Sequence, residues 1–98
     1  MLMEAREEAE AAAQWYENLQ QGLGERFLES LAGALEHIET QPQLFPLLET
    51  LNTRRKVRRC ILRRFPYMVV YEVRPQETLV YAVAHVRRRP NYWKKRLQ

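Results

Sequence analysis

Hydrophobic positions in the first forty residues repeat with the period of an α-helix. One set, spaced by three or four residues, falls on a single helical face: Ala5, Ala9, Ala12, Tyr16 and Leu19. A second set follows at Phe27, Leu28, Leu31, Leu35 and Ile38. Between the two sets, Gly22-Leu23-Gly24 breaks the pattern, because glycine adopts the positive φ values that close a helix. The pattern predicts two helices in an antiparallel hairpin, the second ending before Pro42.

The composition changes to strand-forming residues after a connection over residues 41–52. The pattern predicts strands at about residues 57–63, 67–74 and 78–85, separated by Pro66 and by Pro75-Gln76-Glu77. Sequential strands with short links form an antiparallel meander, which would pack on the apolar face of the hairpin. The predicted fold class is therefore α+β, in one domain of 98 residues. The tail from Pro90 is open to two interpretations, a short helix or an extended arm.

Charge divides the chain into an acidic and a basic half. Residues 1–49 contain ten Glu and two Arg, a formal charge of −8, whereas residues 50–98 contain fourteen Lys and Arg and two Glu, a formal charge of +12. A basic half of this kind suggests an anionic partner, either a nucleic acid or an acidic protein segment.

Several classes of protein are excluded by simple features. The apolar runs are far shorter than the roughly 20 residues that span a bilayer, and the acidic start lacks the positive region of a signal peptide. One cysteine, Cys60, and two distant histidines make neither a disulfide nor a zinc site. No phosphate-binding or dinucleotide-binding motif occurs. We therefore expect a soluble cytoplasmic domain with no cofactor, no metal and no membrane partner.

The first basic cluster is residues 54–64, of which seven of the eleven are Lys or Arg. On a strand, alternation would put Arg59 and Arg63 on the same face as Val57 and Ile61. The cluster is either a charged sheet edge that prevents aggregation or an anion-binding surface.

The second basic cluster is residues 85–96, at the exit of the last predicted strand. Its arginines offer fork-shaped donors for phosphate or carboxylate groups. Tyr92 and Trp93 either stack on bases and anchor an interface or cap the core, and His85 is either a packing residue or a functional one. Near either cluster in sequence, the only acids are Glu72 and Glu77, so chemistry by paired carboxylates is poorly supported.

Five segments, in this order along the chain, are similar to one known family. They are Ala12-Ala13-Gln14-Trp15-Tyr16-Glu17, Gly22-Leu23-Gly24-Glu25-Arg26-Phe27, Pro42-Gln43-Leu44-Phe45-Pro46, Arg63-Arg64-Phe65-Pro66-Tyr67 and His85-Val86-Arg87-Arg88-Arg89-Pro90-Asn91-Tyr92-Trp93. Together they resemble the RelE/ParE superfamily, the toxins of bacterial type II toxin–antitoxin modules, often labelled plasmid stabilisation proteins. The resemblance covers roughly residues 5 to 97.

The resemblance implies a fold and a partner, and the start of the chain departs from the pattern of the family. It implies an αα-hairpin packed on a small antiparallel sheet, and a cognate antitoxin that wraps an acidic or amphipathic segment around the toxin. Members usually begin with a hydrophobic strand, for which this chain offers only Met1-Leu2-Met3. A shortened or missing first strand would expose a sheet edge, which favours a homodimer through that edge. An inactive toxin remnant is a further interpretation.

The superfamily has two activities, and the chain matches each in part. RelE-like members cut messenger RNA on the ribosome with Lys, Arg and Tyr side chains; the matching set here is Arg59, Arg63, Arg87 and Tyr92. ParE-like members inhibit DNA gyrase and are not enzymes. Met68 follows Tyr67 where RelE-like members place an arginine, and an apolar side chain cannot stabilise a charged phosphorane. We therefore favour the ParE-like branch, with the ribonuclease and a basic nucleic-acid-binding module as alternatives.

The residues expected to contact the antitoxin or the target come from both basic clusters and the strand ends between them. They are Arg58, Arg63, Arg64, Tyr67, His85, Arg87, Arg88 and Trp93.

Overall fold

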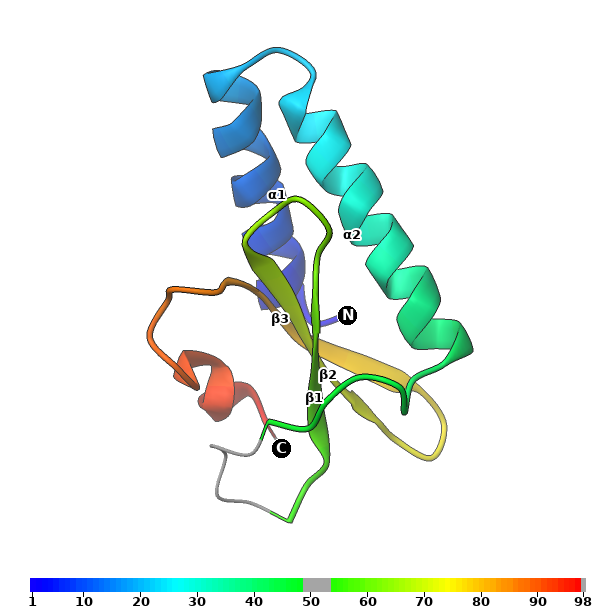
Figure 1. Ribbon diagram of the computed structural model, residues 1–98. Coiled ribbons are helices and arrows are strands. Elements are labelled where there is room, and N and C mark those ends of the chain that lie inside the picture. Colours follow the sequence, from blue (N-terminus) through cyan, green and yellow to red (C-terminus); the bar gives the residue numbers. More distant parts are fainter. Residues whose placement is uncertain (49–53, 98) are drawn as a thin grey trace.

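The protein is described here from a computed structural model that covers residues 1–48 and 54–97. Two helices precede a three-stranded sheet (Figure 1). The elements are α1 (Met3–Leu19), α2 (Leu23–Thr40), β1 (Val57–Ile61), β2 (Tyr67–Val73), β3 (Thr78–His85) and the 3-10 helix η1 (Tyr92–Arg96). All neighbouring strands are antiparallel, in the order β1-β2-β3. The predicted α+β class, the helical hairpin and the meander are thus confirmed.

Element boundaries differ slightly from those predicted. The first strand ends at Ile61 rather than at residue 63, and the second ends one residue early, at Val73. The tail contains the short helix η1, so the first of its two interpretations is correct. Part of the predicted connection over residues 41–52 lies outside the described residues.

Gly22 and Gly24 join the two long helices for different reasons. Gly22 has the positive φ of 89° that the break in the pattern predicts. Gly24 instead lies inside α2, where a Cβ atom would come within 2.5 Å of the Ala13 carbonyl oxygen of α1. The carboxylate of Glu17 on α1 accepts hydrogen bonds from the backbone N–H groups of Gly22 and Gly24, at 2.9 and 3.0 Å. A side chain of the first helix therefore caps the start of the second.

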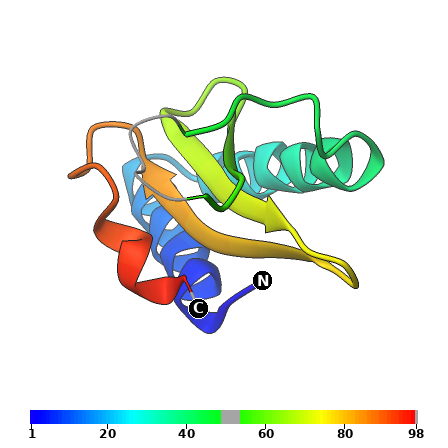
Figure 2. The ribbon, with the colours of Figure 1, turned by 90° about the horizontal axis from the view of Figure 1, so that it is seen from below.

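The sheet has a separate apolar core on each face. The face toward the hairpin contributes Cys60, Leu62, Val69, Tyr71, Val80 and Val83, which pack against the buried side chains of α1 and α2. On the other face, η1 places Trp93 against Val57, Val70, Tyr81, Ala82 and Ala84. Both Tyr81 and Ala82 belong to this second core because the pairing of β2 with β3 shifts by one residue between Val70 and Tyr71. Figure 2 shows η1 lying beside the first turns of α1.

Both outer edges of the sheet carry further backbone hydrogen bonds. Along β1, Leu48 donates to Val57 and Arg59 donates to Pro46, at 2.9 and 3.1 Å. Along β3, the N–H group of Leu2 donates to the Val80 carbonyl at 3.0 Å. The short start of the chain therefore occupies part of an edge, and the homodimer through an exposed edge stays a prediction.

Candidate functional site

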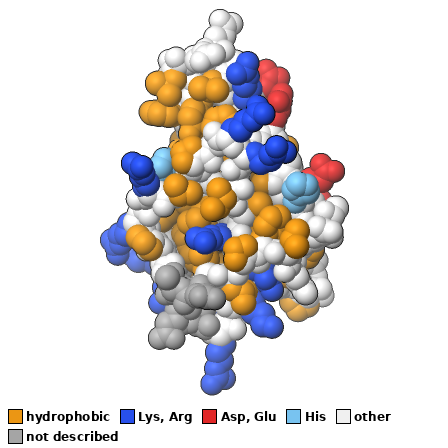
Figure 3. Space-filling view, viewed as in Figure 1, with side chains coloured by type: hydrophobic (Ala, Val, Ile, Leu, Met, Phe, Trp, Pro, Cys, Tyr) orange, Lys and Arg blue, Asp and Glu red, His pale blue; other side chains and the backbone are white. Residues whose placement is uncertain are grey.

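The turn over residues 62–66, between β1 and β2, packs against the helical hairpin. The Phe65 ring lies edge-on to Tyr16 and Phe27, with ring centroids 4.9 and 5.3 Å apart. The Ser30 hydroxyl donates to the Arg63 carbonyl at 2.8 Å. The turn lies between two grooves, which we name the α2 groove and the α1 groove. Figure 3 shows hydrophobic side chains gathered along this face, with Lys and Arg side chains around them.

The α2 groove, about 1080 Å³ in volume, lies between α2 and β1. Its apolar lining includes Ala34, Phe45, Cys60, Ile61 and Phe65. The exposed side chains of Arg26, Arg63 and Arg64 border it, and Glu29, Glu36 and His37 lie along α2. Burial raises the pKa of the Cys60 thiol, which makes Cys60 a poor nucleophile at neutral pH. The groove is thus an apolar slot whose border carries three arginines and two glutamates.

The α1 groove, about 700 Å³ in volume, lies between α1 and the ends of β2 and β3. Trp15 and Leu19 form its outer apolar wall and are 57% and 61% exposed. Its polar lining consists of Glu8, Tyr16, Tyr67, His85 and Arg88. Exposed large apolar side chains beside charged groups are typical of a protein-binding surface.

Two tyrosines, Tyr16 and Tyr67, line the α1 groove. Within residues 1–48 and 54–97, no hydrogen bond to the hydroxyl of Tyr16 or Tyr67 occurs, and the one buried side-chain polar atom without a partner is Trp93 Nε1. Burial raises the pKa of both tyrosines, and the nearby Tyr67 raises the pKa of Tyr16 further. Both hydroxyls therefore remain protonated donors at neutral pH.

His85 is oriented by its own loop. Its Nδ1 atom accepts a hydrogen bond from the backbone N–H of Arg87 at 3.0 Å, and its ring lies edge-on to Tyr67 at 5.2 Å between centroids. Because Nδ1 is the acceptor, the neutral imidazole carries its proton on Nε2.

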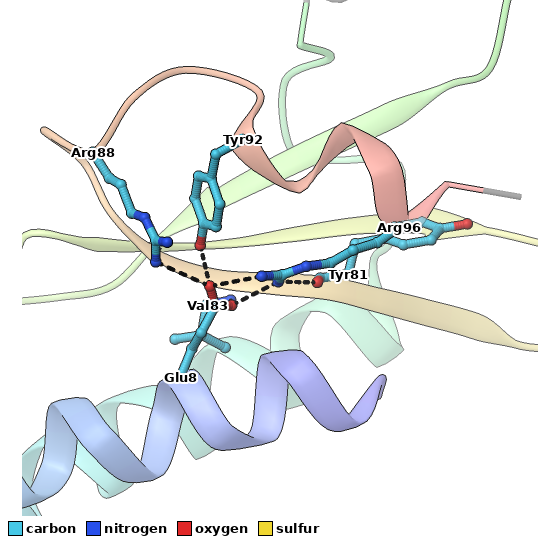
Figure 4. Close-up of polar contacts among 6 residues, drawn as sticks. All are labelled: Glu8, Tyr81, Val83, Arg88, Tyr92 and Arg96. Carbon is cyan, nitrogen blue, oxygen red and sulfur yellow. Dashed lines mark hydrogen bonds and ion pairs between the residues drawn. The ribbon is translucent and has the colours of Figure 1, made fainter.

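A single carboxylate, that of Glu8 on α1, holds the second basic cluster in place (Figure 4). Arg96 donates to both of its oxygens at 2.9 and 3.2 Å, Arg88 donates at 3.3 Å, and the Tyr92 hydroxyl donates to Oε2. The backbone N–H of Val83 donates to Oε1 at 3.1 Å. Burial, together with the bond to Glu8, raises the pKa of Tyr92. Glu8 thereby ties α1 to β3 and η1.

A second carboxylate, that of Glu72 in β2, binds a residue of the first basic cluster. Arg55 donates to both of its oxygens at 3.0 and 2.7 Å, and the Tyr81 hydroxyl donates at 2.7 Å. The hydrogen bond from Arg55 is the main cause that lowers the pKa of Glu72, against its burial. This network lies at the border of the second core.

Arg58, predicted to contact a partner, is bound to the chain itself. Its guanidinium donates to the carbonyls of Phe45 and Gln43 at 2.7 and 3.3 Å. Trp93, for which two roles were open, is 1% exposed and fills the second core, so its indole presents no surface to a partner in this structure.

The structure does not assemble the four candidate ribonuclease residues in either groove. Of Arg59, Arg63, Arg87 and Tyr92, only Arg63 lines one of the two grooves. Arg63 does not continue the alternation of β1 as expected, because the strand has ended and Arg64 adopts a positive φ of 68°. The Tyr92 hydroxyl donates a hydrogen bond to Glu8.

The remaining candidates divide between the two grooves. Arg63 and Arg64 line the α2 groove, whereas Tyr67, His85 and Arg88 line the α1 groove. Arg87 is exposed and lines neither.

Sequence reasoning missed the roles of Glu8, Trp15 and Tyr16. Glu72 and Glu77 are the acids near the basic clusters in sequence, but in space Glu8 also meets the second cluster, from the other end of the chain. A signal was available: Glu8 follows Ala5 by three residues and precedes Ala12 by four, so it borders the buried stripe of α1. A carboxylate beside a buried stripe requires a partner.

No helix in the described parts of the chain has the length and apolar character to cross a membrane. Those same residues contain no group of three or more His, Cys, Asp or Glu side chains placed to hold a metal ion.

One comparison with known proteins gave a match. A family model described as the ParE toxin of the type II toxin–antitoxin system, parDE, matches residues 2–90. No curated protein and no solved structure matches the chain.

Proposed function

The chain belongs to the ParE toxin family of type II toxin–antitoxin systems, and from this membership we propose that it arrests growth in the cytoplasm by binding DNA gyrase, without being an enzyme. A cognate antitoxin neutralises it. The family membership supports the pairing with an antitoxin, and the dispersal of the candidate ribonuclease residues supports the choice of target.

The observation that carries the choice is the dispersal of the groups a ribonuclease would need. A metal-free ribonuclease requires its proton donors and cations within hydrogen-bond reach of one phosphate. Here only Arg63 of the four candidates lines a groove, the Tyr92 hydroxyl is bound to Glu8, and Met68 follows Tyr67 in β2. This arrangement favours a protein that acts by binding.

We place the antitoxin segment in the α2 groove. The apolar lining around Phe45 and Phe65 would take the apolar face of an amphipathic segment. Arg63 and Arg64, the two arginines that the basic half contributes to its border, would face acidic side chains of the segment.

Purified gyrase tests the target directly. The full chain, added to gyrase and relaxed plasmid, is expected to inhibit supercoiling at stoichiometric concentrations, and added antitoxin should restore the activity. A chain that leaves supercoiling unchanged at a large molar excess would refute the proposal.

The ribonuclease alternative predicts a different result in cells. After controlled expression, total RNA and plasmid supercoiling are followed in the same cultures, with toeprinting of translating ribosomes. Growth arrest with relaxed DNA and intact messages fits gyrase, whereas new cleavage sites in messages during arrest would replace gyrase by the ribosome.

A further inference from the structure

The α1 groove contains hydrogen-bond donors that have no acceptor among the described residues. The hydroxyls of Tyr16 and Tyr67 have no partner among the described residues, and both stay protonated at neutral pH. His85 presents an Nε2–H donor, because its Nδ1 accepts from the Arg87 backbone. Arg88 donates one N–H to Glu8, and its side chain is 54% exposed. A ligand that satisfies these donors must be an acceptor.

The one carboxylate that the described residues place in the groove, that of Glu8, is already occupied by donors of the chain itself. Glu8 lies at its border, but its carboxylate already receives Arg88, Arg96, the Tyr92 hydroxyl and the Val83 N–H. Arg88 and Arg96 share this one carboxylate, and Arg88, whose side chain is 54% exposed, keeps further N–H groups directed to the groove and solvent. Arg88 is held in position by stacking over the Tyr92 ring, with its Cζ atom 3.7 Å from the ring centroid. The donors are therefore positioned before a ligand arrives.

The apolar wall distinguishes a protein carboxylate from a nucleic-acid phosphate. Trp15 and Leu19 lie exposed along the groove and would contact the apolar neighbours of an acidic side chain. A phosphodiester chain would instead run past the acidic surface of α1, where Glu4, Glu7 and Glu10 are exposed. Repulsion by these carboxylates disfavours a polyanion, whereas a single carboxylate needs only the local donors.

We propose that Tyr16, Tyr67, His85 and Arg88 form a carboxylate-binding subsite, which receives an Asp or Glu side chain on an apolar segment of a protein partner. The subsite is separate from the α2 groove, so it adds a second contact to the proposed antitoxin groove. The proposed subsite follows from the geometry of the α1 groove and does not depend on whether gyrase is the target.

Nuclear magnetic resonance of the isotope-labelled full chain tests the subsite. The probes are acetate, an amidated tetrapeptide with two leucines and one glutamate, its glutamine counterpart, and a uridine tetranucleotide, at constant ionic strength. With acetate, we expect saturable changes in the chemical shifts of the His85 ring and the Trp15 indole N–H. The glutamate peptide should bind more tightly than acetate. The glutamine peptide should bind about tenfold more weakly, because a hydrogen bond to a charged group is lost.

Three variants locate the binding. Tyr67→Phe keeps the ring against Tyr16 and Phe27, removes only the hydroxyl, and should weaken binding of the glutamate peptide about tenfold. Arg88→Ala should weaken it at least as much. Arg89→Ala, an exposed neighbour outside both grooves, is the matched control and should leave the affinity for the glutamate peptide unchanged.

Each remaining outcome overturns the proposal. Shifts that do not saturate, shifts confined to Arg63 and Arg64, or equal affinity for the glutamate and glutamine peptides would exclude a carboxylate subsite here. Tighter binding of the tetranucleotide than of the glutamate peptide would make the groove a nucleic-acid site instead. Gyrase inhibition measured on the same variants reports separately on the proposed target.

Discussion

The two basic clusters of this protein are stabilised by different kinds of partner. In the first, residues 54–64, Arg55 pairs with Glu72 of the neighbouring sheet strand and Arg58 binds backbone carbonyls, while Arg63 and Arg64 remain exposed at a groove. In the second, residues 85–96, one carboxylate of α1 takes Arg88, Tyr92 and Arg96 together. The formal charge of the basic half therefore overstates the charge available to a partner, and the first cluster retains the greater share of free arginine.

The largest expected effect comes from removing the central carboxylate of the second cluster. Glu8→Gln should lower the free energy of unfolding by about 3 kcal/mol, because two arginines and the Val83 N–H lose a shared charged acceptor. Urea denaturation measures the change. Glu7→Gln, on the same helix and exposed, is the control and should change it by less than about 0.5 kcal/mol. Equal effects of the two variants would contradict the role of Glu8.

Removing the carboxylate that binds the first cluster should lower the free energy of unfolding by a smaller amount. Glu72→Gln should lower the free energy of unfolding by about 2 kcal/mol at pH 7, since Arg55 keeps some exposure to water and the amide can still accept from Tyr81. Glu77→Gln, which is exposed, is the matched control.

The contribution of Glu72 to the free energy of unfolding should depend on pH. The pKa of Glu72 is lower in the folded protein than its ordinary value of 4.5, mainly through the hydrogen bond from Arg55. Its ionised form therefore contributes stability at neutral pH, and this contribution disappears as the pH falls below 4.5 and through the lowered folded pKa. The difference in unfolding free energy between wild type and Glu72→Gln should be constant from pH 7 to pH 5 and shrink below. A difference that grows in acid would contradict the assignment.

Neighbouring arginines of β1 allow a sharper comparison within the first cluster. Arg58→Ala should destabilise the fold by about 1 kcal/mol, because the carbonyls of Gln43 and Phe45 lose their donor. Arg59→Ala, one residue on and exposed, should leave stability within about 0.5 kcal/mol of wild type. Thermal unfolding of the pair distinguishes a structural arginine from a free one, and equal losses would show that neither carbonyl contact matters.

The smallest effect on stability is expected where the effect on binding is largest. Arg63 and Arg87 are both exposed, so the double variant Arg63→Ala/Arg87→Ala should change the free energy of unfolding by less than about 0.5 kcal/mol. The double variant should weaken the complex with the cognate antitoxin, as measured by calorimetry, and Arg63→Ala alone should account for most of the loss because Arg63 lines the α2 groove. Unchanged affinity would place the antitoxin on another surface.

Much of the fold could be predicted because its signals are local. The alanine stripe of α1 lies on one helical face whatever it packs against, and Ala5, Ala9 and Ala12 are buried as expected. Pro66 and Pro75 mark the ends of strands through the fixed geometry of proline. Leu19 and Leu28 fit the same helical patterns but are exposed, since a pattern does not say how far the partner surface extends.

The candidate site could be predicted only in part. Tyr67, His85 and Arg88 were recognised as candidates from their motifs, and the structure brings them to one groove. The same motifs included Trp93, which is buried, and they gave no role to Glu8 or Tyr16. Burial and pairing of these residues depend on which element covers each face of the sheet, and that information is not local.

The sequence by itself determined the two helices, the three strands, their antiparallel order and the division of charge, because each follows from periodicity, turn residues or counting. Tertiary structure alone decided which charges are free, since Glu8 and Arg96 are 88 residues apart and meet only when η1 packs beside α1. It also decided the two grooves, which exist because the turn over residues 62–66 packs against the hairpin through Phe65. Coulomb attraction and packing act through space, and no pattern along the chain records those distances.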